Sequence, residues 1–304
     1  MRFGHLGLLL GEQYDVREMG STPDERLRTL VVEDARNYAI ELGRVPKYLA
    51  QMLIDGGIDK VAAKEANAWH STLRRVTLAM NRAFVLSLSG PSDVRVQQSG
   101  VLSQWRGYGG NGGYALVLDT RKLEVMLEAE ARHHNYMHVQ LGDVYYHGIE
   151  PTIQPATPDI EEYEQIFHQG ISRMMRGGTA EETPRFYEAV TSLSCLYKHW
   201  GFWEEREVRL VVVPASDEVA NAGEPQTPPR KEIKAFSRNE KDIPYVELFA
   251  AGGPASAKGR LPVKRVIVGP HKDRELHAAS VRELLALNGY FAEVAQSEIP
   301  YIGR

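Results

Sequence analysis

The chain has 304 residues, 43% of them hydrophobic and 25% charged, which is ordinary composition for a globular protein. The formal net charge is −4 and the isoelectric point is about 6.2, whereas domains that coat nucleic acid or an anionic membrane usually carry a positive excess. Nonspecific nucleic-acid binding is therefore not favoured, although a local basic patch remains compatible with the composition.

A single cysteine, Cys195, excludes an intramolecular disulfide and a cysteine-based zinc site. It lies in a partly apolar helical stretch and is predicted to be a buried structural thiol. No stretch is long and apolar enough to span a bilayer, and the first residues turn acidic too soon for a signal peptide. We expect a cytoplasmic protein that does not enter the membrane, and the sequence does not predict its oligomeric state.

The first part of the chain is predicted to be helical. Thr22-Pro23-Asp24-Glu25 is a capping box with proline at the first helical position, and Gly43 marks the end of that helix. A short helix is expected after Pro46. A longer one is expected over residues 59–81, where apolar residues recur at helical spacing.

From residue 83 apolar residues no longer recur at helical spacing, and predicted strands and helices follow one another. A strand over 83–89 ends at Gly90-Pro91, and a glycine-rich loop follows it. Further strands are expected over 114–118, 138–146, 205–213, 232–236, 244–248, 265–269 and 290–296. Further helices are expected over 120–131, 158–176, 184–199 and 275–288. Residues 215–230 are rich in proline and are expected to form a long exposed loop.

This order of elements predicts an α+β fold, in which helices pack around a mostly antiparallel mixed sheet after a helical N-terminal extension. We expect one domain over residues 1–304, with a helical N-terminal part over 1–80 and a core over 81–304.

The predicted strand that ends at Gly90 carries two hydroxyls, Ser87 and Ser89, which project to the same face because side chains alternate along a strand. Aligned hydroxyls can orient a carboxylate or bind a ligand amide. The alternative is a strand that leaves the core with its polar end in water.

The segment that follows combines two aromatic rings and a guanidinium with five glycines, at 107, 109, 110, 112 and 113. So many glycines cost backbone entropy, which indicates a need for close approach or positive φ. Trp105 and Tyr108 can stack on a planar ring, and Arg106 can bind a phosphate or carboxylate. Alternatively the segment is a turn that Trp105 anchors in the core.

A third segment alternates charges: Glu205, Glu207 and Arg209 are expected on one face of a strand, with Lys198 shortly before them. Adjacent carboxylates raise each other's pKa and a guanidinium opposes that shift, an arrangement that suits acid–base work or holding a developing cation. The alternative is a solvated strand face with an ion pair of little energetic value.

Histidines at 133, 134 and 138 have no accompanying metal-binding motif, and a metal site is not predicted there. Dinucleotide-binding, P-loop, zinc-protease and serine-hydrolase motifs are absent from the sequence.

Several segments together resemble the bacterial domain of unknown function 2971 family. They span about residues 80–304 in the family's order. They are Phe84-Val85-Leu86-Ser87-Leu88-Ser89, Leu102-Ser103-Gln104-Trp105-Arg106-Gly107-Tyr108-Gly109, Lys198 with Phe202, Glu205, Glu207 and Arg209, Pro244-Tyr245-Val246-Glu247, Leu261-Pro262-Val263 to Val268-Gly269-Pro270, and Ser297-Glu298-Ile299-Pro300-Tyr301. The amino-terminal part departs from the family pattern, because no initial aromatic or His-Tyr strand motif is recognisable.

The Ser-x-Ser strand and the Glu-x-Glu strand are also similar to the scheme of ADP-ribosyltransferases, in which NAD is the substrate. The resemblance implies that Ser87 and Ser89 position NAD and that Trp105 or Tyr108 stacks on nicotinamide. It also implies that Glu207 is catalytic and is assisted by Glu205.

Three hypotheses remain open from the sequence. The first is an enzyme that processes NAD or another nucleotide. The second is a non-catalytic regulatory module that binds a nucleotide, a nucleic-acid end or a protein through an anion site. That anion site would consist of Arg106, Lys198, Arg209 and Arg238. The third assigns these segments to structure alone and places function in the amino-terminal helices or on a partner surface.

Overall fold

The computed structural model describes residues 4–5, 82–91, 93–109, 112–147, 154, 157–175, 184–215, 228–238, 240–249 and 260–300. The helices expected before residue 82 and most of the loop expected over 215–230 lie outside the described residues.

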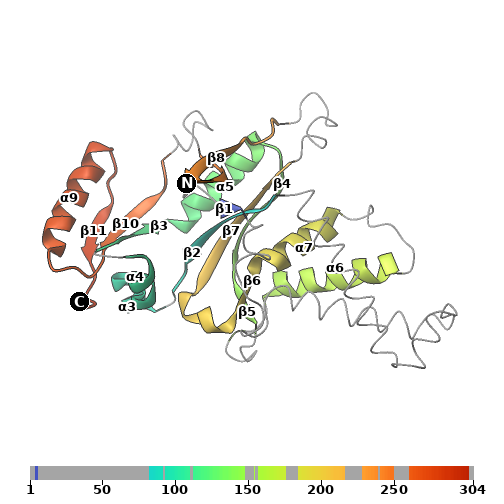
Figure 1. Ribbon diagram of the computed structural model, residues 1–304, viewed down its shortest axis with the longest axis horizontal. Helices are drawn as coiled ribbons and strands as arrows, with labels where there is room; N and C mark the ends of the chain where they lie inside the picture. Colours follow the sequence, from blue (N-terminus) through green and yellow to red (C-terminus); the bar gives the residue numbers. More distant parts are fainter. Residues whose placement is uncertain are drawn as a thin grey trace.

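The described part of the chain contains both strands and helices, which Figure 1 labels. The strands are β1 (Gly4–His5), β2 (Phe84–Ser89), β3 (Tyr114–Leu118), β4 (Tyr136–Asp143), β5 (Tyr145–His147), β6 (Tyr197–His199), β7 (Glu207–Pro214), β8 (Ile233–Arg238), β9 (Lys241–Val246), β10 (Val263–Val268) and β11 (Glu293–Gln296). The helices are α3 (Val94–Ser99), α4 (Leu102–Tyr108), α5 (Thr120–His133), α6 (Pro158–Met175), α7 (Pro184–Leu196), the 3-10 helix η3 (Trp200–Glu205) and α9 (Arg274–Leu287). The predicted α+β class is confirmed.

The strands form a central sheet in the order β1-β2-β7-β4 and a second sheet in the order β11-β10-β3, with two small sheets, β5-β6 and β8-β9. The central sheet is antiparallel, whereas β10 pairs with β11 and β5 pairs with β6 in parallel. The pairing is therefore mostly antiparallel but mixed, as predicted, although it is divided among several sheets.

One face of the central sheet carries the main hydrophobic core. Strand alternation sends Phe84, Leu210 and Val212 to this face, where they pack with Leu123 and Leu127 of α5. The opposite face is covered at one end by α7, which Figure 1 shows beside β4 and β7. The central sheet therefore lies between helices on both faces.

The segment expected to be a glycine-rich loop contains two short helices, α3 and α4. The carboxylate of Asp93 accepts hydrogen bonds from the amides of Arg95 and Val96 and so caps α3. Gly107 lies within the last turn of α4, and only the residues from Gly109 onward turn toward β3. The predicted loop is thus too long. The glycines near its end indicate a loop, but the segment begins with Asp93, which is a good helix N-cap.

Near the segment that contains Lys198, Glu205 and Glu207, two observed element boundaries differ from the predicted ones. The helix expected over 184–199 ends at Leu196, because residues 197–199 pair in parallel with β5. The strand expected from residue 205 begins at Glu207, after a residue in the left-handed region, Arg206 (φ 44°). None of the described helices has the length and apolar character that crossing a bilayer requires.

Candidate functional site

The serine strand and the glutamate strand lie side by side in the central sheet. Ser87 is directly opposite Arg209, and Ser89 is directly opposite Glu207. Directly opposed residues of an antiparallel pair project to the same face, so the two hydroxyls, the carboxylate and the guanidinium share one surface. The two motifs that are 116 residues or more apart in sequence therefore form one polar site, which we call the Glu207 cluster (Ser87, Ser89, Lys198, Glu205, Glu207 and Arg209).

Two cations hold the carboxylates of the cluster. The Lys198 ammonium donates to Glu205 at 2.6 Å and to Glu207 at 2.8 Å. The Arg209 guanidinium donates to Glu207 through Nε at 2.9 Å and Nη2 at 3.1 Å. Arg209 also donates to the carbonyl of Cys195, which is one of the unpaired carbonyls at the end of α7. These contacts engage every charge of the cluster.

Glu205 does not share the strand with Glu207, contrary to the prediction. It ends the 3-10 helix η3, whose first turn is capped by the His199 imidazole accepting from the amide of Gly201. The left-handed backbone of Arg206, with its guanidinium stacked on the Trp203 ring, then starts β7. The bend still brings Glu205 to Lys198, so both carboxylates meet the same ammonium.

Glu207 stays ionised. Burial raises the pKa of this carboxyl, but the hydrogen bonds and charge of Arg209 outweigh burial, with help from Lys198 and the Ser87 hydroxyl, and bring the pKa to about 2. Burial likewise lowers the pKa of Lys198, and its bonds to Glu205 and Glu207 reverse that effect, so the net shift is upward. A carboxyl with this pKa is unsuited to proton transfer near pH 7 and suited to holding positive charge.

The two carboxylates differ in accessibility. The Glu207 side chain is 5% exposed and the Glu205 side chain is 20% exposed. Glu207 receives bonds from Lys198, Arg209 and Ser87, which use most of the acceptor positions of a carboxylate. Glu205 is the carboxylate that a ligand reaches more easily.

Trp105 is half-buried, and its indole anchors α4 while part of the ring lines the groove described below. Its indole N–H donates to the carbonyl of Ser99 at 2.9 Å, and the ring packs against Gly100 and Gly269. A Cβ at Gly100 would lie 2.6 Å from the indole and one at Gly269 would lie 2.9 Å from it, so both glycines are needed for close approach. These contacts agree with the anchoring alternative for Trp105, and stacking on a ligand stays a prediction.

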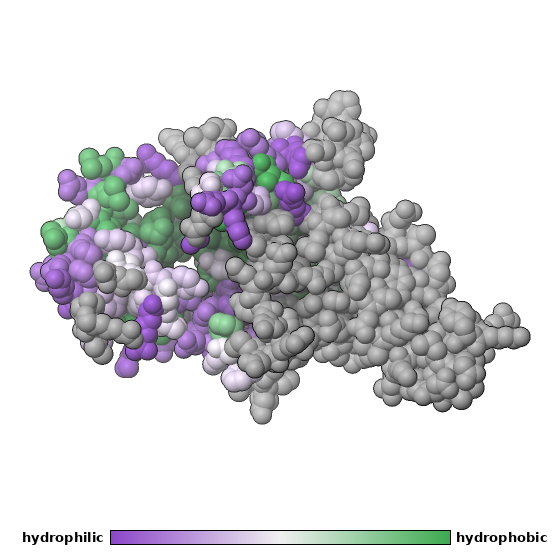
Figure 2. Space-filling model, in the orientation of Figure 1, coloured by the Kyte–Doolittle hydropathy of each residue, from purple (hydrophilic) through white to green (hydrophobic). Residues whose placement is uncertain are grey.

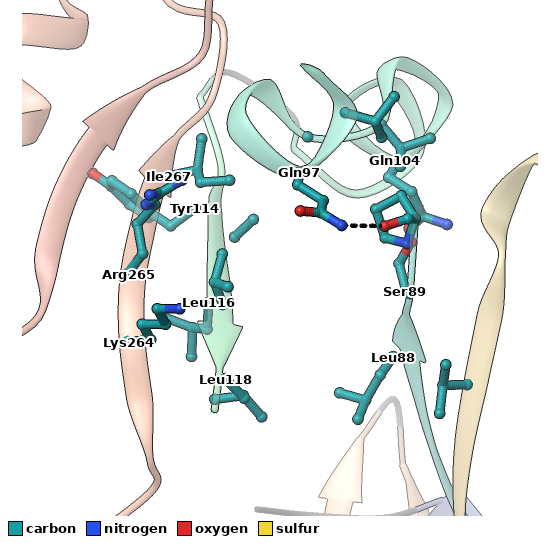
Figure 3. A pocket seen from close by; sticks show the side chains of 18 of the residues that line it. Leu88, Ser89, Gln97, Gln104, Tyr114, Leu116, Leu118, Lys264, Arg265 and Ile267 are labelled. Atoms are coloured by element: carbon teal, nitrogen blue, oxygen red, sulfur yellow. Dashed lines mark hydrogen bonds between the residues drawn. The ribbon is translucent and has the colours of Figure 1, made fainter. Parts of the chain in front are cut away.

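A groove with a volume of about 960 Å³ lies between β2 and β3, beneath α3 and α4. Figure 3 shows Leu88 and Ser89 on one side and Leu116 on the other, with Gln97 and Gln104 at one end. In Figure 2 hydrophobic residues occupy a recess in the left half of the view, rimmed by hydrophilic ones.

The groove and the Glu207 cluster meet only at the end of β2. Leu88 and Val208 line the groove. Side chains alternate along a strand, so their neighbours Ser87 and Glu207 point to the other face of the sheet. Ser89 lines the groove, while its hydroxyl donates to the carbonyl of Glu205.

The other residues predicted for the site are dispersed. Tyr108 is 82% exposed and lines the groove, whereas Arg106 is exposed on α4 and is not among the lining residues. Arg238 ends β8 opposite Lys241, and it neither lines the groove nor binds a member of the Glu207 cluster in the described part of the chain. Of the four cations predicted to form an anion site, Lys198 and Arg209 both bind the carboxylate of Glu207.

Sequence reasoning did not identify Tyr146, whose hydroxyl accepts the amide N–H of Glu207 at 2.8 Å. Tyr146 is the middle residue of the short strand β5, and no sequence motif marks it. Sequence reasoning also missed the basic residues of the groove, Arg121, Lys264 and Arg265, since they are far apart in sequence.

A second polar network joins two buried residues, His138 and Ser192, to the partly exposed Glu188. The imidazole Nε2 is 3.3 Å from the hydroxyl, and Nδ1 is 3.9 Å from the carboxylate. Ser192 is fully buried and donates to Gln140 at 2.9 Å, so it lacks the access that a nucleophile needs. No trio of His, Cys, Asp or Glu in the described residues is arranged to hold a metal ion.

Comparison with known proteins gives one match. A family model described as "Protein of unknown function (DUF2971)" matches residues 104–210, which include most of α4, all of α7, Lys198 and the start of β7. No curated protein and no solved structure matches the chain. The resemblance to the domain of unknown function 2971 family is therefore confirmed over residues 104–210.

Proposed function

We propose that the protein is an enzyme that processes NAD or a related nucleotide at the Glu207 cluster. One observation carries the proposal: Ser87 and Ser89 face Arg209 and Glu207 across adjacent strands, with their side chains on the same face. This is the juxtaposition of serine and glutamate strands that the ADP-ribosyltransferase resemblance requires. A cytoplasmic location, expected from the sequence, would give access to NAD.

The chemistry of such a site is cleavage of the bond between ribose C1′ and the nicotinamide nitrogen. The bonding electron pair leaves with nicotinamide, which becomes neutral, and positive charge develops on the ribose. A fixed carboxylate beside C1′ stabilises that charge without accepting a proton. Water or an acceptor group then bonds to C1′ and releases its proton.

The accessibility of the carboxylates assigns different roles to them. Glu205 is exposed enough to face the ribose, while Glu207 lies beneath it and fixes Lys198 and Arg209. Ser87 and Ser89 are exposed. Their hydroxyls donate to Glu207 and to the carbonyl of Glu205, so their oxygens are left to accept hydrogen bonds from the ligand. The sequence had placed catalysis on Glu207 with Glu205 assisting. The proposal therefore exchanges their roles.

Nicotinamide release from NAD by the purified protein tests the proposal, with cell extract added as a source of acceptors. We expect release by the wild type and a large loss, of about 100-fold, in Glu205→Gln. Glu204→Gln is the matched control, because Glu204 is exposed in the same 3-10 helix and has no part in the cluster. Absence of release from folded wild-type protein would contradict the enzyme proposal.

A second candidate is a non-catalytic module that binds a nucleotide, a nucleic-acid end or a protein. The position of the groove favours it, because a ligand between β2 and β3 would not touch Glu207. Under this candidate a ligand binds with unchanged affinity when Glu205 is replaced by glutamine, and no turnover accompanies binding.

A further inference from the structure

The groove between β2 and β3 is bordered by strand β3. β3 pairs with β10 on one side, and none of the strands that the structure describes pairs with its other side. Its sequence, Tyr-Ala-Leu-Val-Leu, contains no charge and no proline. Tyr114 is 49% exposed and Leu116 is 56% exposed. An exposed, apolar strand with an unpaired edge favours pairing with another strand.

The hydrogen bonds at both ends of β3 define which backbone groups are unpaired. Gly269 donates to the carbonyl of Gly113, and the amide of Asp119 donates to the carbonyl of Pro262, so odd-numbered residues point toward β10. Backbone polar groups alternate in direction along an antiparallel strand. The amides and carbonyls of Tyr114, Leu116 and Leu118 therefore point to the open edge.

The opposite wall of the groove has a similar edge. β2 pairs with β7 along its length, whereas β1 covers only Phe84 and Val85. Beyond Val85 no described strand pairs with this edge of β2. Figure 3 shows β2 and β3 facing each other across the groove.

The charged side chains of the groove favour an acidic occupant. Arg121, Lys264 and Arg265 line it, and Asp119 is the carboxylate among the lining residues. Asp119 is already engaged in capping α5, where it accepts from the amide of Lys122. Arg265 binds Glu293, and Lys264 has no ion-pair partner in the part of the chain that the structure describes.

We infer that the groove binds an extended acidic peptide of a partner protein, which adds a strand to the open edge of β3. Main-chain hydrogen bonds to Tyr114, Leu116 and Leu118 supply affinity, and Lys264 selects acidic side chains. This inference narrows the second candidate function to one class of partner. It is independent of chemistry at the Glu207 cluster.

The test begins with selection of a phage-displayed library of random dodecapeptides on the full-length protein. Enriched peptides are synthesised with a fluorescent label and titrated by fluorescence anisotropy. Leu116→Pro removes an amide donor at the open edge, where proline is tolerated because that N–H does not pair with β10. Leu116→Thr keeps the donor and is the matched control.

We expect enrichment of peptides with acidic residues in an extended, apolar pattern. Leu116→Pro should weaken their binding at least about tenfold, while Leu116→Thr changes it much less. Lys264→Glu should reduce the affinity for acidic peptides and favour basic ones. Hydrogen exchange should slow at the amides of Leu116 and Leu118 when peptide is bound.

Several results would overturn the inference. One is the absence of any enriched peptide that depends on the β3 edge. Another is equal binding by the proline and threonine variants. Dimerisation of the free protein that Leu116→Pro abolishes would assign the edge to a second copy, and protection of these amides by single-stranded RNA would assign it to nucleic acid. Nicotinamide release depends on Glu205, so failure here and failure of the enzyme proposal are separable.

Discussion

Replacing Glu207 with glutamine should remove a large, pH-dependent part of the stability. The folded-state pKa of this carboxyl is about 2, compared with 4.5 as its ordinary value. That depression corresponds to about 3 kcal/mol at neutral pH, since one pKa unit equals about 1.4 kcal/mol. Because the folded pKa is the lower one, this stability is present above pH 4.5 and is lost as the pH falls toward 2.

Urea unfolding followed by tryptophan fluorescence measures the effect. We expect Glu207→Gln to be about 3 kcal/mol less stable than wild type at pH 7, and this difference should narrow by about 2 kcal/mol at pH 3. Glu204→Gln controls for loss of a carboxylate from an exposed position in η3. A difference of the same size at both pH values would refute the reasoning, because it would show that packing and not ionisation determines the loss.

Three further predictions concern other parts of the fold. Lys231→Met leaves the buried Glu130 carboxylate without its 2.6 Å ion pair and should lower the stability measured by thermal unfolding by about 3 kcal/mol or more. Lys234→Met breaks a surface ion pair and should lower the stability by less. Equal losses of stability in the two variants would contradict this prediction. In urea unfolding, Trp105→Ala should lower the stability of the protein by about 2 kcal/mol or more, whereas Tyr108→Ala should change it by no more than about 0.5 kcal/mol. A larger loss of stability in Tyr108→Ala than in Trp105→Ala would mean that Trp105 is not the anchor. Cys195 is buried and burial raises its pKa to about 12, so it should react with a thiol reagent only in denaturant, and rapid labelling of the native protein would contradict its position.

Several elements follow directly from local sequence. β3 has the bounds that its apolar run predicted, because glycine precedes it and a capping Asp119 starts the next helix. The starts and ends of α5 and α9 also lie within two residues of the predicted ones. In these segments local propensity and tertiary structure agree.

The remaining differences have a tertiary cause. Tyr197–His199 looked helical and became a strand, because its partner β5 is some 50 residues earlier in the sequence. α4 depends on Trp105 packing against Gly269, which no local pattern around residue 105 contains. Long-range pairing overrides propensity in short segments.

Only part of the site could be predicted, because the site also depends on long-range strand pairing. Alternation placed Ser87 and Ser89 on one face, but only the register between β2 and β7 brings them opposite Arg209 and Glu207. The bend at Arg206, which moves Glu205 off the strand, depends on a left-handed backbone that the residue type does not indicate. Accessibility, which distinguishes the two carboxylates, depends on the whole fold.

Hydrogen exchange with and without NAD tests most directly whether the ligand binds at the Glu207 cluster. The account predicts slower exchange in the peptides that contain Ser87, Ser89 and Glu205. The same protection should appear in Glu205→Gln, because Glu205 acts on the charge that develops after NAD has bound. Protection confined to residues 114–118, on the groove side of β3, would place the nucleotide away from the carboxylates and contradict the enzyme proposal.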